Sequence, residues 1–94
     1  MSALWISHAT VTDHEAYGRY ARLAKDVIHA HGGEFLVRSG AHRQMEGTDR
    51  PRNVVVRFAS LEAAVGCYES PEYQAALAHA DHAAERSLVI VEEL

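Results

Sequence analysis

The sequence lacks several features that would assign a protein to a particular class. Its 94 residues include one cysteine, Cys67, so the chain forms no internal disulfide and holds no cysteine-rich zinc site. No stretch reaches the ~18 apolar residues that a membrane-spanning helix needs. The amino terminus lacks the basic and apolar regions of a secretory signal. These absences predict a soluble, unprocessed protein of the reducing cytoplasm.

Clustered positive charge is also missing. Nine lysine and arginine residues stand against thirteen aspartate and glutamate residues, which gives a net charge of -4 at pH 7. The basic residues form no run, so we expect neither nucleic acid nor an anionic membrane as a partner. The sequence contains no glycine-rich phosphate loop, nucleophile elbow or carboxylate dyad, and we expect no cofactor.

Apolar residues, by contrast, are plentiful. They make up 48% of the chain, which is enough to form a core. A chain of this length suits a single domain over residues 1–94, and it buries only somewhat more than ~60% of its unfolded surface. A partner subunit would therefore add stability.

Hydrophobic spacing predicts four strands and two helices. The first strand covers Leu4–Val11. Thr12 and Glu15 then have the spacing of a capping box, which predicts a helix over about Asp13–His31 that Gly32-Gly33 ends. The remaining predicted elements are strands over Glu34–Arg38, Asn53–Phe58 and Leu88–Val91, and a second helix that Ser60 caps and that breaks at Ser70-Pro71.

The segment after the second strand is polar. We expect Ala41–Glu46 to continue that strand beyond a bulge at Ser39-Gly40, before a turn leads into the third strand.

The order of these elements predicts an α+β fold. A β-α-β-β-α-β order with two right-handed crossovers is typical of a ferredoxin-like sandwich, in which both helices cover one face of a four-stranded antiparallel sheet. The runs LVIV and VVV are apolar on both sides of their strands, so the helix-free face also needs a cover. We therefore predict a homodimer in which two sheets pack face to face as an α/β barrel.

Three basic side chains are candidates for a ligand site. Strand alternation places Arg38 on the same face as Leu36, and it gives His8 and Arg57 the same orientation on their own strands. We expect these three basic residues to line one anion-binding cavity on the helix-free face. In the alternative interpretation, Arg38 and Arg57 form structural ion pairs, with Glu46 or with a carboxylate of the partner chain.

Proton transfer in such a cavity would need an acceptor. His8 or Glu46 is the candidate, with Arg38 as the anchor for a small anionic or carbonyl-bearing molecule. A lone histidine on an apolar face is also commonly a core residue. His79 and His82 share a helix face, but no third ligand accompanies them, so we expect no metal site.

Tyrosines at apolar helical positions have two possible roles. Tyr17, Tyr20, Tyr68 and Tyr73 are expected to pack in the core with their hydroxyls at its edge. Alternatively, they frame the mouth of the ligand pocket. Cys67 has no activating neighbour in the sequence and is expected to be a packing residue.

Several motifs together resemble a known family. They are YxxY in the long helix, GGEFLVRSG, EG at Glu46-Gly47, RNVVVRF, and YESPEYQAA followed by LVIVEE. Over nearly its whole length the chain resembles the bacterial domain-of-unknown-function family DUF1330. The resemblance implies a ferredoxin-like fold in the dimeric α/β-barrel superfamily, and it implies no particular reaction. The matching positions are Tyr17, Gly33, Arg38, Gly40, Glu46, Gly47, Arg52, Ser60, Tyr68, Ser70, Pro71, Glu72 and Tyr73.

The chain departs from the family pattern at Ser39, Arg57, Ala59 and Ala80. Ala80 stands where an arginine is usual, and Arg57 is a candidate to replace it.

Two functions are compatible with these features. The first is a small-molecule binding protein, or a cofactor-independent enzyme, with its site at Arg38. The second is a non-catalytic dimeric binding or accessory module in which the same residues are structural.

Overall fold

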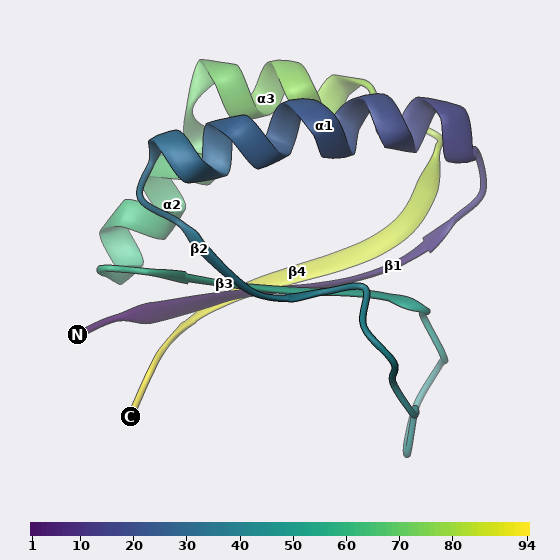
Figure 1. Cartoon of the computed structure of the whole chain (residues 1–94), viewed down its shortest axis with the longest axis horizontal. Helices are drawn as coiled ribbons and strands as arrows, with labels where there is room; N and C mark the ends of the chain where they lie inside the picture. The colour runs from purple at the N-terminus through teal and green to yellow at the C-terminus, as the bar shows by residue number, and fades with distance from the viewer.

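Four antiparallel strands form one sheet in the order β2-β3-β1-β4, and all three helices cover the same face of it (Figure 1). The structure is a computed structural model that describes all 94 residues. This is the predicted ferredoxin-like arrangement, with the second helix divided in two. The elements are β1 (Ala3–Val11), α1 (His14–Ala30), β2 (Glu34–Arg38), β3 (Arg52–Phe58), α2 (Leu61–Glu69), α3 (Pro71–Ala78) and β4 (Ala84–Glu92).

The start of α1 differs from the predicted capping box. Asp13, not Thr12, is the cap, because its carboxylate accepts a hydrogen bond from the backbone N–H of Ala16 at 3.1 Å. The backbone N–H groups of Thr12 and Asp13 both donate to the carbonyl of Ala83, at 2.8 and 3.0 Å. These bonds tie the residue before the cap to the loop that precedes β4. The helix therefore begins at His14.

The caps of the two later helices are as predicted. Ser60 accepts from the N–H of Ala63 at 3.0 Å, and Ser70 accepts from the N–H of Tyr73 at 3.1 Å. Pro71 occupies the first turn of α3, where its missing N–H is not needed. The break between α2 and α3 is thus specified locally by Ser70 and Pro71.

The predicted continuation of β2 is wrong. The strand ends at Arg38, and Ser39 adopts a left-handed conformation with φ of 57°. The bulge lies earlier than predicted, between Phe35 and Val37, so Leu36 is the inserted residue. Residues 39–51 form an arm that projects from the sheet on the side opposite the helices (Figure 1).

The core lies between the sheet and the helices. The largest fully buried side chains are Trp5, Tyr73, Phe58, Val56 and Cys67. None of the helices is long and apolar enough to span a membrane.

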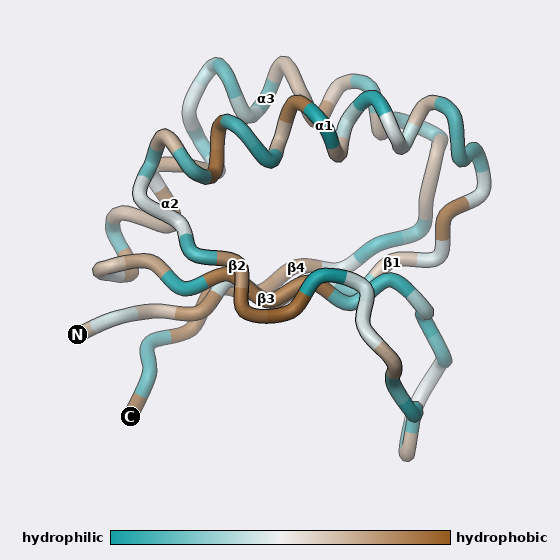
Figure 2. The backbone as a smooth tube through the Cα atoms, viewed as in Figure 1, coloured by the Kyte–Doolittle hydropathy of each residue, from teal (hydrophilic) through white to brown (hydrophobic).

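The helix-free face of the sheet is apolar and uncovered. Leu36, Val37, Val89 and Val91 are 41%, 40%, 55% and 47% exposed. Hydrophobic positions concentrate where the strands cross below the helices (Figure 2). Water contact over such a surface is unfavourable, so the face has the character of an interface.

Candidate functional site

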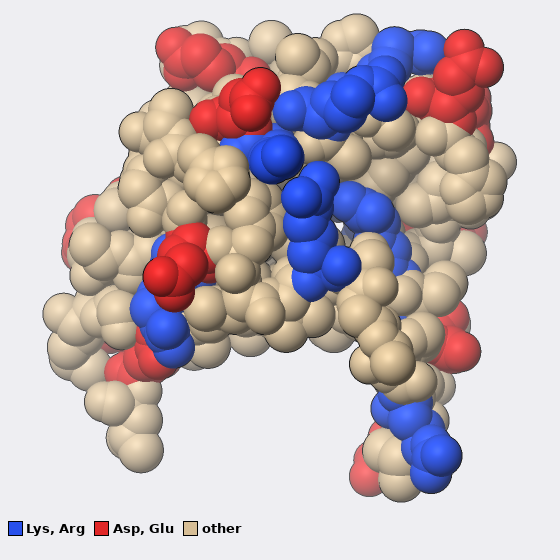
Figure 3. Space-filling view, in the orientation of Figure 1, with Lys and Arg blue, Asp and Glu red and all other residues tan.

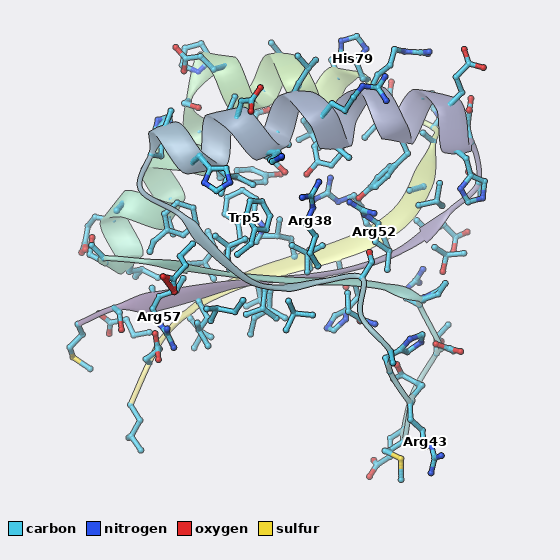
Figure 4. All side chains as sticks on the ribbon, in the orientation of Figure 1. Trp5, Arg38, Arg43, Arg52, Arg57 and His79 are labelled. Atoms are coloured by element: carbon cyan, nitrogen blue, oxygen red, sulfur yellow. The ribbon has the colours of Figure 1, made fainter.

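A narrow cleft between α1 and the β2–β3 half of the sheet brings together cationic side chains from three elements. Arg38 from β2, Arg52 from β3 and Lys25 from α1 all line it. Arg38 and Arg52 rise from the sheet into the space below α1 (Figure 4). In the space-filling view, lysine and arginine side chains gather around a hollow at this place (Figure 3).

The charge of the cleft is not compensated. None of its twelve lining residues is an aspartate or glutamate. Arg38 and Arg52 belong to no ion pair, and Nη1 of Arg52 donates a hydrogen bond to Ser39 Oγ at 3.3 Å. Arg38 and Lys25 are exposed, so water screens their charges, whereas Arg52 is half-buried. The arrangement is suited to an anion.

Aromatic rings hold the two guanidinium groups in place. The Arg38 guanidinium carbon lies 5.5 Å from the centre of the Phe35 ring, and that of Arg52 lies 5.3 Å from the Tyr17 ring. Stacking of this kind orients an arginine without using its hydrogen-bond donors. Most donors of both arginines therefore stay available to a ligand.

Behind the cleft, Arg86 of β4 adds a further cation. Its Nη2 donates to the Tyr73 hydroxyl at 3.3 Å, and its guanidinium carbon lies 4.9 Å from the Tyr20 ring. Its Nη1 is buried and has no hydrogen-bond partner. The Tyr20 and Tyr73 hydroxyls are 2.6 Å apart, and the Tyr17 and Tyr20 ring centres are 5.0 Å apart. Three tyrosines thus surround one half-buried positive charge.

The ionisation of this cluster follows from burial. Burial raises the pKa of Tyr17 and of Tyr73 above the usual value for tyrosine. Burial opposes the charge of Arg86, but the tyrosines around it raise its pKa, so it stays a cation. At neutral pH Tyr17 and Tyr73 are therefore neutral hydrogen-bonding groups and not phenolate bases.

Cys67 is not a reactive group. It is fully buried, and burial raises the pKa of its thiol to about 11. Its predicted packing role is confirmed.

The predicted shared cavity of His8, Arg38 and Arg57 is wrong. The bulge at Leu36 turns Arg38 to the helix side, while Arg57 lies on the opposite face (Figure 4). His8 also faces away from the helices, and its Nδ1 is hydrogen-bonded to Asn53 Oδ1.

His8 contributes to a separate polar pocket of about 210 Å³. The other lining residues are Gln44, Thr48, Arg50 and Ser87. No acidic residue lines this pocket, although Arg50 contacts the Glu85 carboxylate at 3.4 Å.

Arg57 lies in an ion-pair cluster at the far end of the helix-free face. Its Nε is 2.6 Å from Glu93 Oε1, and its Nη1 is 3.7 Å from Glu34 Oε1. The hydrogen bond to Glu93 raises the pKa of Arg57 and lowers that of Glu93. Structural pairing was the alternative interpretation of Arg57, although the partner is Glu93 and not Glu46.

The remaining candidates are spread over the molecule. Glu46 is exposed on the arm, away from the cleft. Tyr17 lines the cleft, Tyr73 is fully buried, and Tyr68 borders a groove of about 220 Å³ beside α2. Ala80 lies in a groove with Arg86 and not with Arg57, so Arg57 does not replace an arginine at that position.

His82 contacts Asp81 at 3.6 Å, and no three side chains of the kinds that bind metals come together in the chain.

Arg52 and Arg86 were missed as site residues, although the sequence contains a signal for both. The third and fourth strands were predicted to start at Asn53 and Leu88, which left both arginines outside them. Extending the alternation of Val54 and Val56 back to Arg52, or that of Leu88 and Ile90 back to Arg86, places each arginine on the helix side.

The comparisons with known proteins agree with the fold. The family model described as Domain of unknown function (DUF1330) matches residues 2–94. No curated protein matches the chain.

Solved structures of similar fold have low sequence identity to the chain. The RPA0582 protein of unknown function from Rhodopseudomonas palustris has 19% identity and a TM-score of 0.79, with 99% of this chain and 82% of that chain covered. A dimeric ferredoxin-like protein of unknown function from Thermobifida fusca has 16% identity and a TM-score of 0.67, with 99% and 92% covered. SnoaB, a cofactor-independent oxygenase from Streptomyces nogalater, has 12% identity and a TM-score of 0.63, with 99% and 93% covered.

Proposed function

The chain belongs to the DUF1330 family, and we propose that this member binds a small carboxylate in the cleft between α1 and the sheet. The observation that carries the proposal is the convergence of Arg38, Arg52 and Lys25 on one cleft whose lining includes no acidic residue. Cations that point into a common space repel one another, and a bound anion would relieve that repulsion.

The size of the cleft suits a carboxylate group. Its cavity volume is about 30 Å³, and each water molecule needs roughly 10–15 Å³ on this measure. The two oxygens of a carboxylate would therefore replace about two waters. Arg38 and Arg52 would each offer a guanidinium fork, which matches carboxylate geometry. The rest of the ligand would extend through the mouth, where Lys25 is exposed.

The proposal concerns binding and assigns no reaction. His8 and Glu46, the candidate proton acceptors, lie outside the cleft, and Tyr17 and Tyr73 are neutral at pH 7. SnoaB is an oxygenase with a similar fold, but folds of this kind carry many functions.

We also propose that the protein is a homodimer. The apolar helix-free face supports this, because its charged groups lie at the two ends, at Arg57 and at Arg50, and leave the centre apolar. Similar structures from Thermobifida fusca and Bacteroides fragilis are described as dimeric. A cytoplasmic location, without nucleic acid or membrane as a partner, fits the reduced buried cysteine and the net charge of -4.

The binding proposal is tested by NMR titration with acetate, using acetamide as the neutral molecule of the same shape. We expect acetate, and not acetamide, to shift the side-chain Nε–H signals of Arg38 and Arg52. Arg38→Gln and Arg52→Gln should each weaken acetate binding about tenfold or more, because each removes a charged hydrogen bond worth roughly 1.5–3 kcal/mol.

Arg43→Gln is the matched control. Arg43 lies on the arm, away from the cleft, so its replacement changes the net charge equally and should leave acetate binding unchanged (Figure 4). Equal responses to acetate and acetamide would contradict the proposal, as would an equal loss of affinity in all three variants.

A further inference from the structure

Arg86 is a half-buried cation that no acidic side chain of the chain neutralises. No carboxylate lies within ion-pair distance of it. Its polar contacts are one hydrogen bond to the neutral Tyr73 hydroxyl and the face of the Tyr20 ring, and Nη1 has no partner. Removing a guanidinium from water is costly unless a negative charge compensates. An arginine without an ion-pair partner is explained more readily by a role toward a ligand than by a contribution to the stability of the fold.

The strand register places this cation beside the cleft. Ala9 of β1 pairs with Arg52 on one side and with Arg86 on the other. Neighbouring strands are about 4.8 Å apart, so the two arginines are separated by about 10 Å at their Cα atoms. The small side chain of Ala9 leaves the space between them to Tyr17.

The positive charges of Arg52 and Arg86 both act on Tyr17. Its ring stacks on Arg52, and it lines the cleft. Burial raises its pKa, while the positive charges of Arg86 and Arg52 act in the opposite direction. The electric field of Arg86 therefore acts on the wall of the cleft. It passes through tyrosine side chains that hold little water, so it is screened less than it would be in water.

We infer that Arg86 determines the charge of the ligand, and that the cleft selects small dianions such as dicarboxylates over monoanions. The inference rests on the proposed function. One carboxylate would lie between Arg38 and Arg52, and the second would lie at the mouth near Lys25. Arg86 would touch neither and would act through its electric field. It is thus a specificity-determining residue behind the Tyr17–Tyr20 wall.

Coulomb's law predicts how the effect of Arg86 on affinity depends on the charge of the ligand. The interaction of Arg86 with a ligand is proportional to the ligand's charge. Over about 10 Å, with an effective dielectric constant of about 40, one unit of ligand charge corresponds to a change in affinity of about fourfold. Loss of Arg86 should therefore weaken the binding of a monoanion about fourfold and that of a dianion further, by up to about sixteenfold, while the binding of a neutral ligand is unaffected. General damage to the cleft would instead weaken the binding of the neutral ligand, the monoanion and the dianion by the same factor.

The experiment compares acetamide, acetate and malonate by NMR titration at pH 8 in wild-type protein, Arg86→Met and Arg86→Lys. We expect Arg86→Met to bind acetate about fourfold more weakly and malonate more weakly still, by up to about sixteenfold. It should melt at the same or a higher temperature, because a partly buried charge without an ion-pair partner is gone. Arg86→Lys retains the charge and should retain most of the preference for malonate. Equal losses for acetate and malonate in Arg86→Met would overturn the inference.

A second measurement needs no variant. Wild-type protein should bind malonate more tightly than acetate, and an affinity ratio of one or less overturns the inference even if Arg86→Met fails to fold. Failure of the proposed function looks different, because neither anion would then shift the Arg38 and Arg52 signals of the wild-type cleft.

Discussion

Gly33 shows how a single residue sets the spacing between α1 and the sheet. A Cβ atom at this position would lie 2.5 Å from Ile28 Cγ2 and 2.9 Å from Val56 Cγ1. Both side chains belong to the core, and Val56 is fully buried. Neither can move far without displacing its neighbours, because protein interiors are close-packed.

We therefore predict that Gly33→Ala lowers the free energy of unfolding by about 1–3 kcal/mol, the usual cost of overpacking. Urea unfolding followed by circular dichroism measures this change. Gly40→Ala is the control, because a Cβ atom at Gly40 meets nothing within 4 Å. A similar small loss in both variants would show that close packing at Gly33 is not the cause.

At the scale of elements, the cap of α1 is Asp13. The Thr12 side chain takes no part in the hydrogen bonds at this end of the helix, and its backbone N–H donates to Ala83 whatever its side chain is. We expect Asp13→Ala to cost about 1 kcal/mol of unfolding free energy and Thr12→Ala to cost little. Thermal and urea unfolding of the two variants test this. A larger loss of unfolding free energy for Thr12→Ala than for Asp13→Ala would instead support the capping box of Thr12 and Glu15 that the sequence predicts.

For the whole molecule, the central question is what covers the helix-free face. Val89 and Val91 of β4 are exposed there, as are Leu36 and Val37 of β2 at the opposite edge of the sheet. A charge within a sheet-to-sheet interface would be desolvated without a partner, which is strongly unfavourable. We predict that wild-type protein is a dimer in light scattering at micromolar concentration and that Val89→Asp is a monomer.

Leu23→Asp is the matched control for the dimer. Leu23 is about as exposed as Val91, but it lies on α1 and not on the helix-free face. Its replacement should leave the dimer intact. A wild-type monomer at these concentrations would rule out the interface, and dissociation by both variants would point to a different contact surface.

Much of the fold was predictable because its signals are local. Gly32-Gly33, Ser60 and Ser70-Pro71 mark the ends of helices through their own backbone geometry and capping bonds. The full length of β4 was not predictable, because the polar residues at its start gain their strand conformation only by pairing with β1. The position of the bulge in β2 likewise depends on its pairing with β3.

Local signals in the sequence were enough to predict the order of the elements and the placement of the helices on one face of the sheet, and they singled out Arg38 as a candidate. They were enough because hydrophobic period and capping chemistry depend on near neighbours along the chain. Only the tertiary structure decided which side of the sheet Arg38 faces. A side-chain period of two means that one inserted residue, Leu36, reverses the face of everything after it. That reversal separates Arg38 from His8 and Arg57, and it brings Arg38 together with Arg52 in the cleft beside Arg86.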